Sequence, residues 1–271
     1  MRRFKMMGLC LVAVFAIAAV AVSSASAALP EYKVCAKAAK VGKSFTGEFT
    51  DKLCSAKSGT KTGKYELESW EAAKKKGFKG KNGVSTLDSY IPENEATPWT
   101  GGTVVGVVQC KSGKSAGEIT GAKTSTVTVE FKTCSSEGKK CTSSGEKAGT
   151  IKTALLKATL GNISGGVGSD VESVSGGPSA EFDCEGLKIV TNGSVIGTNS
   201  GNVNKVSKEG VQTFAVNAKG GQEVVFGEFP ASPVTGEAHF LVSEITPPGV
   251  NLPSGQATVS TLKGEALEIA D

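Results

Sequence analysis

The chain has 271 residues, with 30 Lys and Arg against 26 Asp and Glu, a single His and 35 Gly. A hydrophobic content of 39% excludes a polytopic membrane protein, and 21% charged residues of balanced sign exclude a charge-driven disordered chain. Large aromatic side chains are scarce, so a core must be built mainly from Val, Ile, Leu and Ala. This length is sufficient for one domain with one sizeable core.

The first 27 residues have the features of a secretory signal peptide. Basic residues at positions 2, 3 and 5 precede an apolar run without charge, Met6 to Val22. The small-x-small motif Ala25-Ser26-Ala27, which signal peptidase accepts, follows directly. Because the apolar run is at the short limit for a membrane span, we expect cleavage after residue 27.

Cleavage would leave residues 28–271, which we predict to form a single secreted domain, extracellular or associated with the cell envelope. Three of the 30 basic residues lie in the leader and no acidic residue does, so the remainder is close to neutral. A nucleic-acid partner is therefore not expected, because such proteins carry a basic domain or stripe. No membrane span is expected after cleavage, and the sequence does not determine the oligomeric state.

Six of the seven cysteines follow residue 27. An even number of cysteines in an exported chain predicts a disulfide framework, although many pairings are possible. No Cys-x2-Cys is present, so the sequence predicts neither a zinc site nor a redox motif, and we expect no metal and no cofactor. Proximity along the chain favours three disulfides: Cys35 with Cys54, Cys134 with Cys141, and Cys110 with Cys184.

Two kinds of apolar pattern predict strands along the body of the chain. Alternation with a period of two indicates strands with one face exposed to water, and continuous short apolar runs indicate strands covered on both faces. The first kind comprises residues 64–68, 125–131, 211–216 and 258–262, and the second comprises 103–108, 224–226 and 240–242.

Turn signals separate these segments, among them Asn82-Gly83, Asn192-Gly193 and Pro247-Pro248-Gly249. The spacing predicts an all-β fold of about 12 to 14 short antiparallel strands, arranged as a sandwich or a partly closed barrel and braced by disulfides. Amphipathic helices between the strands, which a parallel α/β sheet would need, are missing from the sequence pattern.

Three other segments depart from the strand pattern. Residues 36–40 are alanine- and lysine-rich and favour a short helix. Residues 68–76 favour another, because acidic side chains come first, lysines come last and a glycine follows. Residues 161–179 are rich in Gly and Ser and predict a long loop.

Nucleophilic catalysis with a histidine base would require His239, the only imidazole. It alternates with apolar neighbours, which is typical of a strand position rather than a catalytic loop. Ser194 has glycines nearby but lacks the spacing of a nucleophile elbow. The oxygen-rich stretches 169–172 and 198–204 follow no known calcium motif. The sequence therefore predicts no catalytic set and no metal ligands.

Acidic pairs capable of glycoside hydrolysis cannot be singled out among 26 acidic residues. Such an enzyme would usually add aromatic platforms for the sugar. The candidates are Trp70, Trp99, Tyr65 and Tyr90, which fall within one third of the chain, although core packing explains them equally well.

A cluster of five lysines is the one pronounced charge feature. Short lysine runs are commonly solvated turns, which is the simpler interpretation. The alternative is a contact with an anionic envelope polymer or polysaccharide, held by charge and weakened by salt. The cluster consists of Lys74, Lys75, Lys76, Lys79 and Lys81.

Several short motifs carry a resemblance to known proteins. They are Leu29-Pro30-Glu31-Tyr32 with Cys35 close behind, Gly63-Lys64-Tyr65-Glu66, and two units in which a strand ends in Cys and is followed by Gly-x-Ile/Val-x-Gly. With these motifs the chain resembles a group of exported, β-rich, cysteine-containing proteins of soil actinobacteria that have no established activity. The resemblance implies export and a β-rich fold, and it carries over no site residues.

The sequence therefore favours an exported non-enzymatic binding or structural protein of the cell envelope or extracellular space. Two alternatives stay open. A secreted carbohydrate-active hydrolase would need a deep cleft with two facing Glu or Asp side chains beside Trp70 or Trp99. A lipocalin-like carrier would need an apolar cavity within the sheets, wide enough for a ligand.

Overall fold

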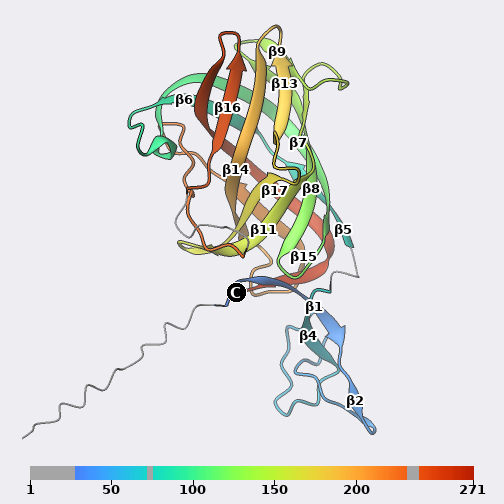
Figure 1. The fold of residues 1–271 in the computed structure, drawn as a ribbon. Helices are drawn as coiled ribbons and strands as arrows, with labels where there is room; N and C mark the ends of the chain where they lie inside the picture. Colours follow the sequence, from blue (N-terminus) through green and yellow to red (C-terminus); the bar gives the residue numbers. More distant parts are fainter. Residues whose placement is uncertain (1–27, 72–75, 231–237) are drawn as a thin grey trace, which may run out of the picture.

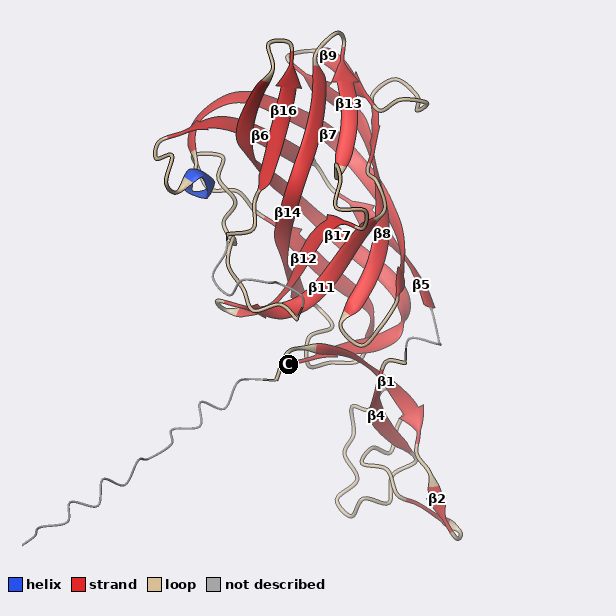
Figure 2. Cartoon of the chain, in the orientation of Figure 1, coloured by secondary structure: helices blue, strands red, loops and turns tan. Residues whose placement is uncertain are grey.

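A computed structural model of the chain describes residues 28–71, 76–230 and 238–271. The predicted signal peptide, together with Lys74 and Lys75, lies outside the described residues. The described chain is almost entirely strand and loop, and its one helical element is the short 3-10 turn η2 (Pro98–Thr100) (Figure 2). No helix in these ranges is long and apolar enough to cross a membrane. The predicted all-β class is confirmed.

The described residues contain seventeen strands, more than the sequence predicted, and all of the pairings between them are antiparallel (Figure 1). They are β1 (Glu31–Lys37), β2 (Lys40–Val41), β3 (Ser44–Phe45), β4 (Tyr65–Ser69), β5 (Lys76–Asn82), β6 (Ser85–Pro92), β7 (Gly102–Ile119), β8 (Thr124–Ser136), β9 (Lys139–Thr142), β10 (Thr150–Lys152), β11 (Leu156–Ile163), β12 (Gly166–Ser173), β13 (Ala180–Cys184), β14 (Lys188–Ser200), β15 (Ser207–Phe214), β16 (Leu241–Thr246) and β17 (Val250–Ala270).

The main sheet closes on itself in two stacked rings. Four long strands, β7, β8, β14 and β17, run through both rings and change partners halfway along (Figure 1). In the upper ring the strand order is β6-β7-β8-β9-β13-β14-β16-β17, and β17 pairs back with β6. In the lower ring the order is β5-β7-β8-β11-β12-β14-β15-β17, and β17 pairs back with β5. Of the two predicted architectures, the fold is therefore the barrel.

The break between β15 and β16 is closed by a side chain. Both strands pair with β17, and the ladder is interrupted between them at Gln256. The side-chain amide of Gln222 accepts a hydrogen bond from the Gln256 N–H at 3.0 Å and donates one to its carbonyl at 3.3 Å. Gln222 is buried, and it satisfies two backbone groups that would otherwise lack partners.

The predicted long loop over residues 161–179 is wrong, because most of this stretch forms the hairpin of β11 and β12. The glycines of this stretch allow neighbouring side chains to pack closely against the strand backbone. A side chain at Gly161 would meet Phe229 at 2.3 Å, and one at Gly168 would meet Ile163 at 2.6 Å. Small residues therefore allow other segments to lie directly on the outer face of the sheet.

A predicted turn and a predicted strand were also wrong, because packing against a distant segment decided the structure there. Asn192-Gly193 lies inside β14 rather than in a turn, and Gly193, with φ of 92°, comes within reach of the Phe240 carbonyl. Residues 224–226 form no strand, and Phe226 is substantially exposed. The segment between β15 and β16, described over residues 215–230 and 238–240, is called the excursion here, and it contacts β14. A local sequence pattern does not encode a contact of this kind.

Neither predicted helix is present in the described residues. Residues 36–40 fall in β1, β2 and the link between them, and β1 pairs with β4. Of residues 68–76, the first two end β4 and the last begins β5, while 72–75 lie outside the described residues. Isolated helices of this length are marginal, so pairing with a distant strand is the stronger influence.

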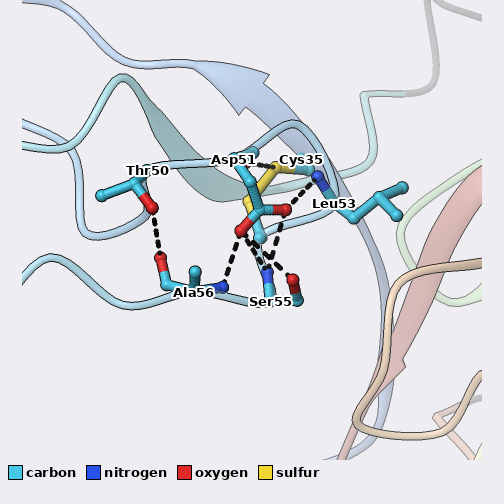
Figure 3. Close-up of a disulfide and its surroundings, with 7 residues drawn as sticks. Cys35, Thr50, Asp51, Leu53, Ser55 and Ala56 are labelled. Carbon is cyan, nitrogen blue, oxygen red and sulfur yellow. Dashed lines mark hydrogen bonds between the residues drawn. A yellow bond between two sulfur atoms is a disulfide. The ribbon is translucent and has the colours of Figure 1, made fainter.

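The N-terminal strands form a small lobe below the barrel (Figure 1). The predicted disulfide between Cys35 and Cys54 ties this lobe together, with Cα atoms 5.7 Å apart (Figure 3). Asp51 organises the loop by accepting hydrogen bonds from the N–H groups of Ala56 and Leu53 at 2.6 and 2.8 Å. These bonds hold the pKa of Asp51 below its usual range.

The other two disulfides are paired differently from the prediction. Four cysteines lie in order across the neighbouring strands β7, β8, β9 and β13. Joining the middle two, as proximity along the chain suggests, would leave the outer two three strand spacings apart, about 14 Å, which is beyond the reach of a disulfide. The structure joins direct neighbours instead, each pair with Cα atoms 4.0 Å apart: Cys110 with Cys134, and Cys141 with Cys184.

Candidate functional site

The two rings of the barrel enclose a cavity of about 180 Å³. It lies between the disulfide-bearing core cluster of the upper ring and a lower cluster around Tyr32, and residues of both clusters contribute to its lining. An apolar cavity of roughly 150 Å³ is large enough to bind benzene. The interior therefore has room for a small organic molecule.

One half of the cavity wall is mainly aliphatic. It is formed by β8, β11, β12 and β14. Polar side chains on this half have partners inside the protein: Asn199 donates to the Ser169 hydroxyl at 2.7 Å, and Ser125 bonds the side chain of Tyr32. The aliphatic lining residues are Val127, Val129, Leu156, Ala158, Val171 and Val195.

The opposite half carries a belt of polar side chains. Strand β17 contributes Gln256, Thr258 and Ser260 from alternate positions, while Val259 between them faces outward and is 50% exposed. Over residues 256–260 the alternation is therefore inverted, with polar side chains inside and an apolar one outside. Ser85 of β6 belongs to the same belt and shares a hydrogen bond of 2.7 Å with Thr258.

Two members of this belt have a polar atom without a protein partner. Asn82 of β5 and Ser115 of β7 both line the cavity and are only 6% and 7% exposed. No described group bonds the Oδ1 atom of Asn82 or the Oγ atom of Ser115. Buried polar groups usually have partners, and an unpaired one costs about 1–3 kcal/mol, so these two atoms mark the place where a ligand or water would bind.

The exposed residues of the lining lie close to one another. Its exposed members are Lys208, Lys263, Gly264 and Glu265, which flank a register irregularity between β15 and β17. Two of the charges there are paired, since Lys263 contacts Glu209 and Lys76 contacts Glu265, while Lys208 has no carboxylate within 4.0 Å in the described ranges. The interrupted ladder therefore provides a mouth whose charges are partly neutralised. The middle of the cavity carries no charged lining residue among those that the structure describes.

The lower end of the barrel is closed by the start of the described chain. The N–H of Tyr32 donates to the carbonyl of Ala122 at 2.6 Å, and the N–H of Trp70 donates to the carbonyl of Tyr32 at 2.8 Å. Both side chains pack with Leu160 and Ile269. Burial raises the pKa of Tyr32, partly offset by its bond to Ser125, so its hydroxyl stays neutral.

Ser194 and His239, considered above for nucleophilic catalysis, lie together outside the cavity. The Oγ atom of Ser194 is 3.0 Å from Nδ1 of His239, and Oδ2 of Asp170 is 3.2 Å from the same nitrogen. A catalytic triad places the serine and the carboxylate on different ring nitrogens, so this arrangement is not a triad. His239 precedes β16 instead of lying in a strand, and its ring packs against Phe229 at 5.5 Å. The group fastens the excursion to the outer face of β12 and β14.

The lysine cluster is only partly described. Lys76 is paired with Glu265, while Lys79 and Lys81 lie on the exposed outer face of β5. Lys81 stands directly opposite Lys114 of β7. Within the described ranges, neither Lys79 nor Lys81 has a carboxylate within 4.0 Å.

The four aromatic residues considered for a sugar platform do not meet. Trp70 packs in the lower core and Tyr65 in the N-terminal lobe. Tyr90 is fully buried, which raises its pKa to about 12. Trp99 is half-buried beside Phe226, with ring centroids 5.8 Å apart. Among the described cavity-lining residues, the only acidic side chain is that of Glu265, which is at the mouth.

No family model, curated protein or solved structure matches this chain. In the part of the chain that the structure describes, no group of three or more His, Cys, Asp or Glu side chains is placed to hold a metal ion. What the fold and the site define is a closed antiparallel β-barrel with a largely apolar interior cavity. Asn82 and Ser115 were not predicted from the sequence. The polar residues at alternate positions of 256–260, which belong to the same belt, were the available signal for a polar inner wall.

Proposed function

We propose that this protein binds a small, mainly apolar molecule inside its barrel. This is the carrier alternative of the sequence analysis, and it is a specific form of the non-enzymatic binding role favoured there. The supporting observation is the cavity of about 180 Å³ between the two core clusters, with an aliphatic half-wall and with its exposed lining residues at the β15–β17 irregularity. Ligand sites of this kind are concave, mostly apolar and supplied with a few polar groups.

We also propose that the protein acts outside the cytoplasm. Three disulfides brace the described chain, and such bonds persist in oxidising compartments. This proposal agrees with the predicted signal peptide and with the resemblance to exported actinobacterial proteins, both of which stay predictions.

The hydrolase alternative has less support. It needs two facing carboxylates in a cleft beside an aromatic platform. The described cavity lining offers one carboxylate, that of Glu265, which is paired with Lys76, and neither Trp70 nor Trp99 belongs to the lining.

A fluorescence titration tests the binding proposal. The neutral dye N-phenyl-1-naphthylamine, which brightens in apolar surroundings, should bind the protein. The variant Ala158→Phe places a ring in the cavity and should abolish the enhancement, while Lys157→Phe adds the same ring to the outer face of β11 and should retain it. Equal binding by both variants, or none by the unmodified protein when its unfolding transition is intact, would overturn the proposal.

A second candidate role concerns the outer face of β5 and β7. Lys81 lies directly opposite Lys114, which is paired with Glu130, whereas Lys79 and Lys81 have no carboxylate within 4.0 Å in the described ranges, so an anionic partner would stabilise these two lysines. We propose an anionic polymer of the envelope as that partner. Retention on immobilised dextran sulfate should fall steeply with salt and should decrease in a variant with Lys79→Gln and Lys81→Gln. Unchanged retention in the variant would exclude this face.

A further inference from the structure

We propose that the ligand of the cavity is a neutral alcohol, whose hydroxyl group is bound by Asn82 and Ser115 and whose apolar body lies against the aliphatic half-wall. This inference rests on the proposed function and specifies its ligand class. It is drawn from three features of the described residues: two buried polar atoms without protein partners, the division of the wall into two halves, and the distribution of charge.

The first feature is the position of the two polar side chains. Asn82 lies opposite Gly113 in the β5–β7 pair, and Ser115 lies opposite Gly80, so the two are diagonal neighbours. Each occupies space that the facing glycine leaves free. The Ser115 hydroxyl is 2.1 Å from the point where Gly80 would carry a side chain, and the Asn82 amide nitrogen is 3.2 Å from the corresponding point at Gly113. The side chains of Asn82 and Ser115 therefore face the cavity from two neighbouring strands, β5 and β7.

The chemistry of these two groups fits a hydroxyl. The unpartnered Asn82 Oδ1 accepts a hydrogen bond, and the Ser115 hydroxyl can donate and accept. An alcohol both donates and accepts, so it complements them, whereas an alkane would leave both atoms unpaired. Ser85 and Thr258 of the belt do not compete for it, because they are bonded to each other.

The second feature is the half-wall that faces this pair. In the lower ring of eight strands, β5 and β17 lie across the barrel from β11 and β12. The inward side chains there are aliphatic, Leu156, Ala158 and Val171 among them. A ligand with a polar end and an apolar body can therefore satisfy both walls at once.

The third feature argues against an anionic ligand such as a fatty acid. The charged lining residues, Lys208, Lys263 and Glu265, are exposed at the mouth, and none of them bonds the unpartnered atoms of Asn82 and Ser115. A carboxylate at the polar pair would be buried without a counter-charge, which is costly. A neutral hydroxyl avoids this cost.

Competition against N-phenyl-1-naphthylamine tests the ligand class. We expect octan-1-ol to displace the dye at a concentration about tenfold lower than octanoate or octane, the factor that corresponds to one net hydrogen bond of roughly 1.4 kcal/mol. The variants Asn82→Leu and Ser115→Ala should reduce this preference. Ser89→Ala is the matched control: it also removes a buried serine hydroxyl, but one that is bonded to Ser254 and lies outside the cavity lining, and it should leave the preference unchanged.

The outcomes separate the two proposals. If the dye binds and Ala158→Phe excludes it, but the three competitors are equally effective, the cavity binds ligands and the alcohol proposal is wrong. The alcohol proposal is also wrong if Ser89→Ala and Ser115→Ala change the preference equally. If the dye fails to bind the folded protein, the proposed function itself fails. Thermal unfolding of each variant shows that the fold is retained.

Discussion

The upper and lower rings of the barrel share four strands but differ in what fills them. Above, the side chains around Cys110–Cys134 and Cys141–Cys184 form a packed cluster with Phe182. Below this cluster the barrel encloses the cavity, whose lining extends up to Cys110 and Phe182, and its lower end is closed by Tyr32 and its neighbours. An eight-stranded ring is just wide enough to be filled by side chains or to hold one small ligand. The comparison shows that one backbone architecture supports both outcomes, and that side-chain size and polarity select between them.

The largest expected effect comes from the disulfides of the upper ring. The double variant Cys141→Ala and Cys184→Ala removes a bridge that closes 43 residues of chain. Chain entropy then predicts a loss of about 4 kcal/mol in the free energy of unfolding, measurable by urea denaturation. Dye binding in the lower ring should persist below the lowered transition. Loss of binding in the folded variant would show that the two rings are not separable.

A matched pair of leucines sharpens the contrast within one strand. Leu160 packs in the lower cluster and is 1% exposed, whereas Leu156 lies four residues earlier on the same face and borders the cavity. Truncating a packed leucine leaves a new void, so Leu160→Ala should cost about 4 kcal/mol and Leu156→Ala about 2 kcal/mol. Chemical denaturation compares the two. Equal losses would mean that the wall around Leu156 is packed as tightly as the lower cluster around Leu160.

The polar belt permits a finer comparison between two serines. Ser85→Ala breaks a buried hydrogen bond with Thr258 and should lower the free energy of unfolding by about 1 kcal/mol. Ser115→Ala removes a hydroxyl that has no protein partner among the described residues and should be neutral or slightly stabilising in the absence of ligand. A substantial loss of stability from Ser115→Ala alone would contradict the assignment of this hydroxyl to a ligand.

The smallest effect concerns Asp88, on the outer side of the upper ring. Burial raises the pKa of its carboxyl, and a hydrogen bond from Thr86 offsets only part of that shift. The folded protein therefore retains this proton to higher pH than the unfolded chain does. Ionisation of Asp88 costs stability as the pH rises through the interval between the two pKa values. Asp88→Asn should reduce this loss and raise the melting temperature slightly at neutral pH. Melting curves across the acid range that are parallel for both proteins would contradict this expectation.

Local patterns in the sequence were sufficient for the class of fold. Alternation at 125–131 and 258–262 predicted strands that the structure contains in β8 and β17. The same alternation did not reveal which face of a strand is internal. In β17, Thr258 and Ser260 are 5% and 6% exposed while Val259 is 50% exposed, the reverse of the usual preference. Hydrophobic patterning alone therefore could not reveal the polar half of the candidate site.

The amino-acid sequence by itself determined that the chain is built of strands, that six cysteines are available for disulfides, and that no familiar catalytic or metal motif is present in it. These properties depend on residue types and on spacing between near neighbours. Tertiary structure decided the closure into two rings, the partners of Cys110 and Cys184, and the meeting of Asn82 with Ser115 inside one wall. These outcomes depend on the register between strands that are distant along the chain, and register is fixed only when all the strands pack together.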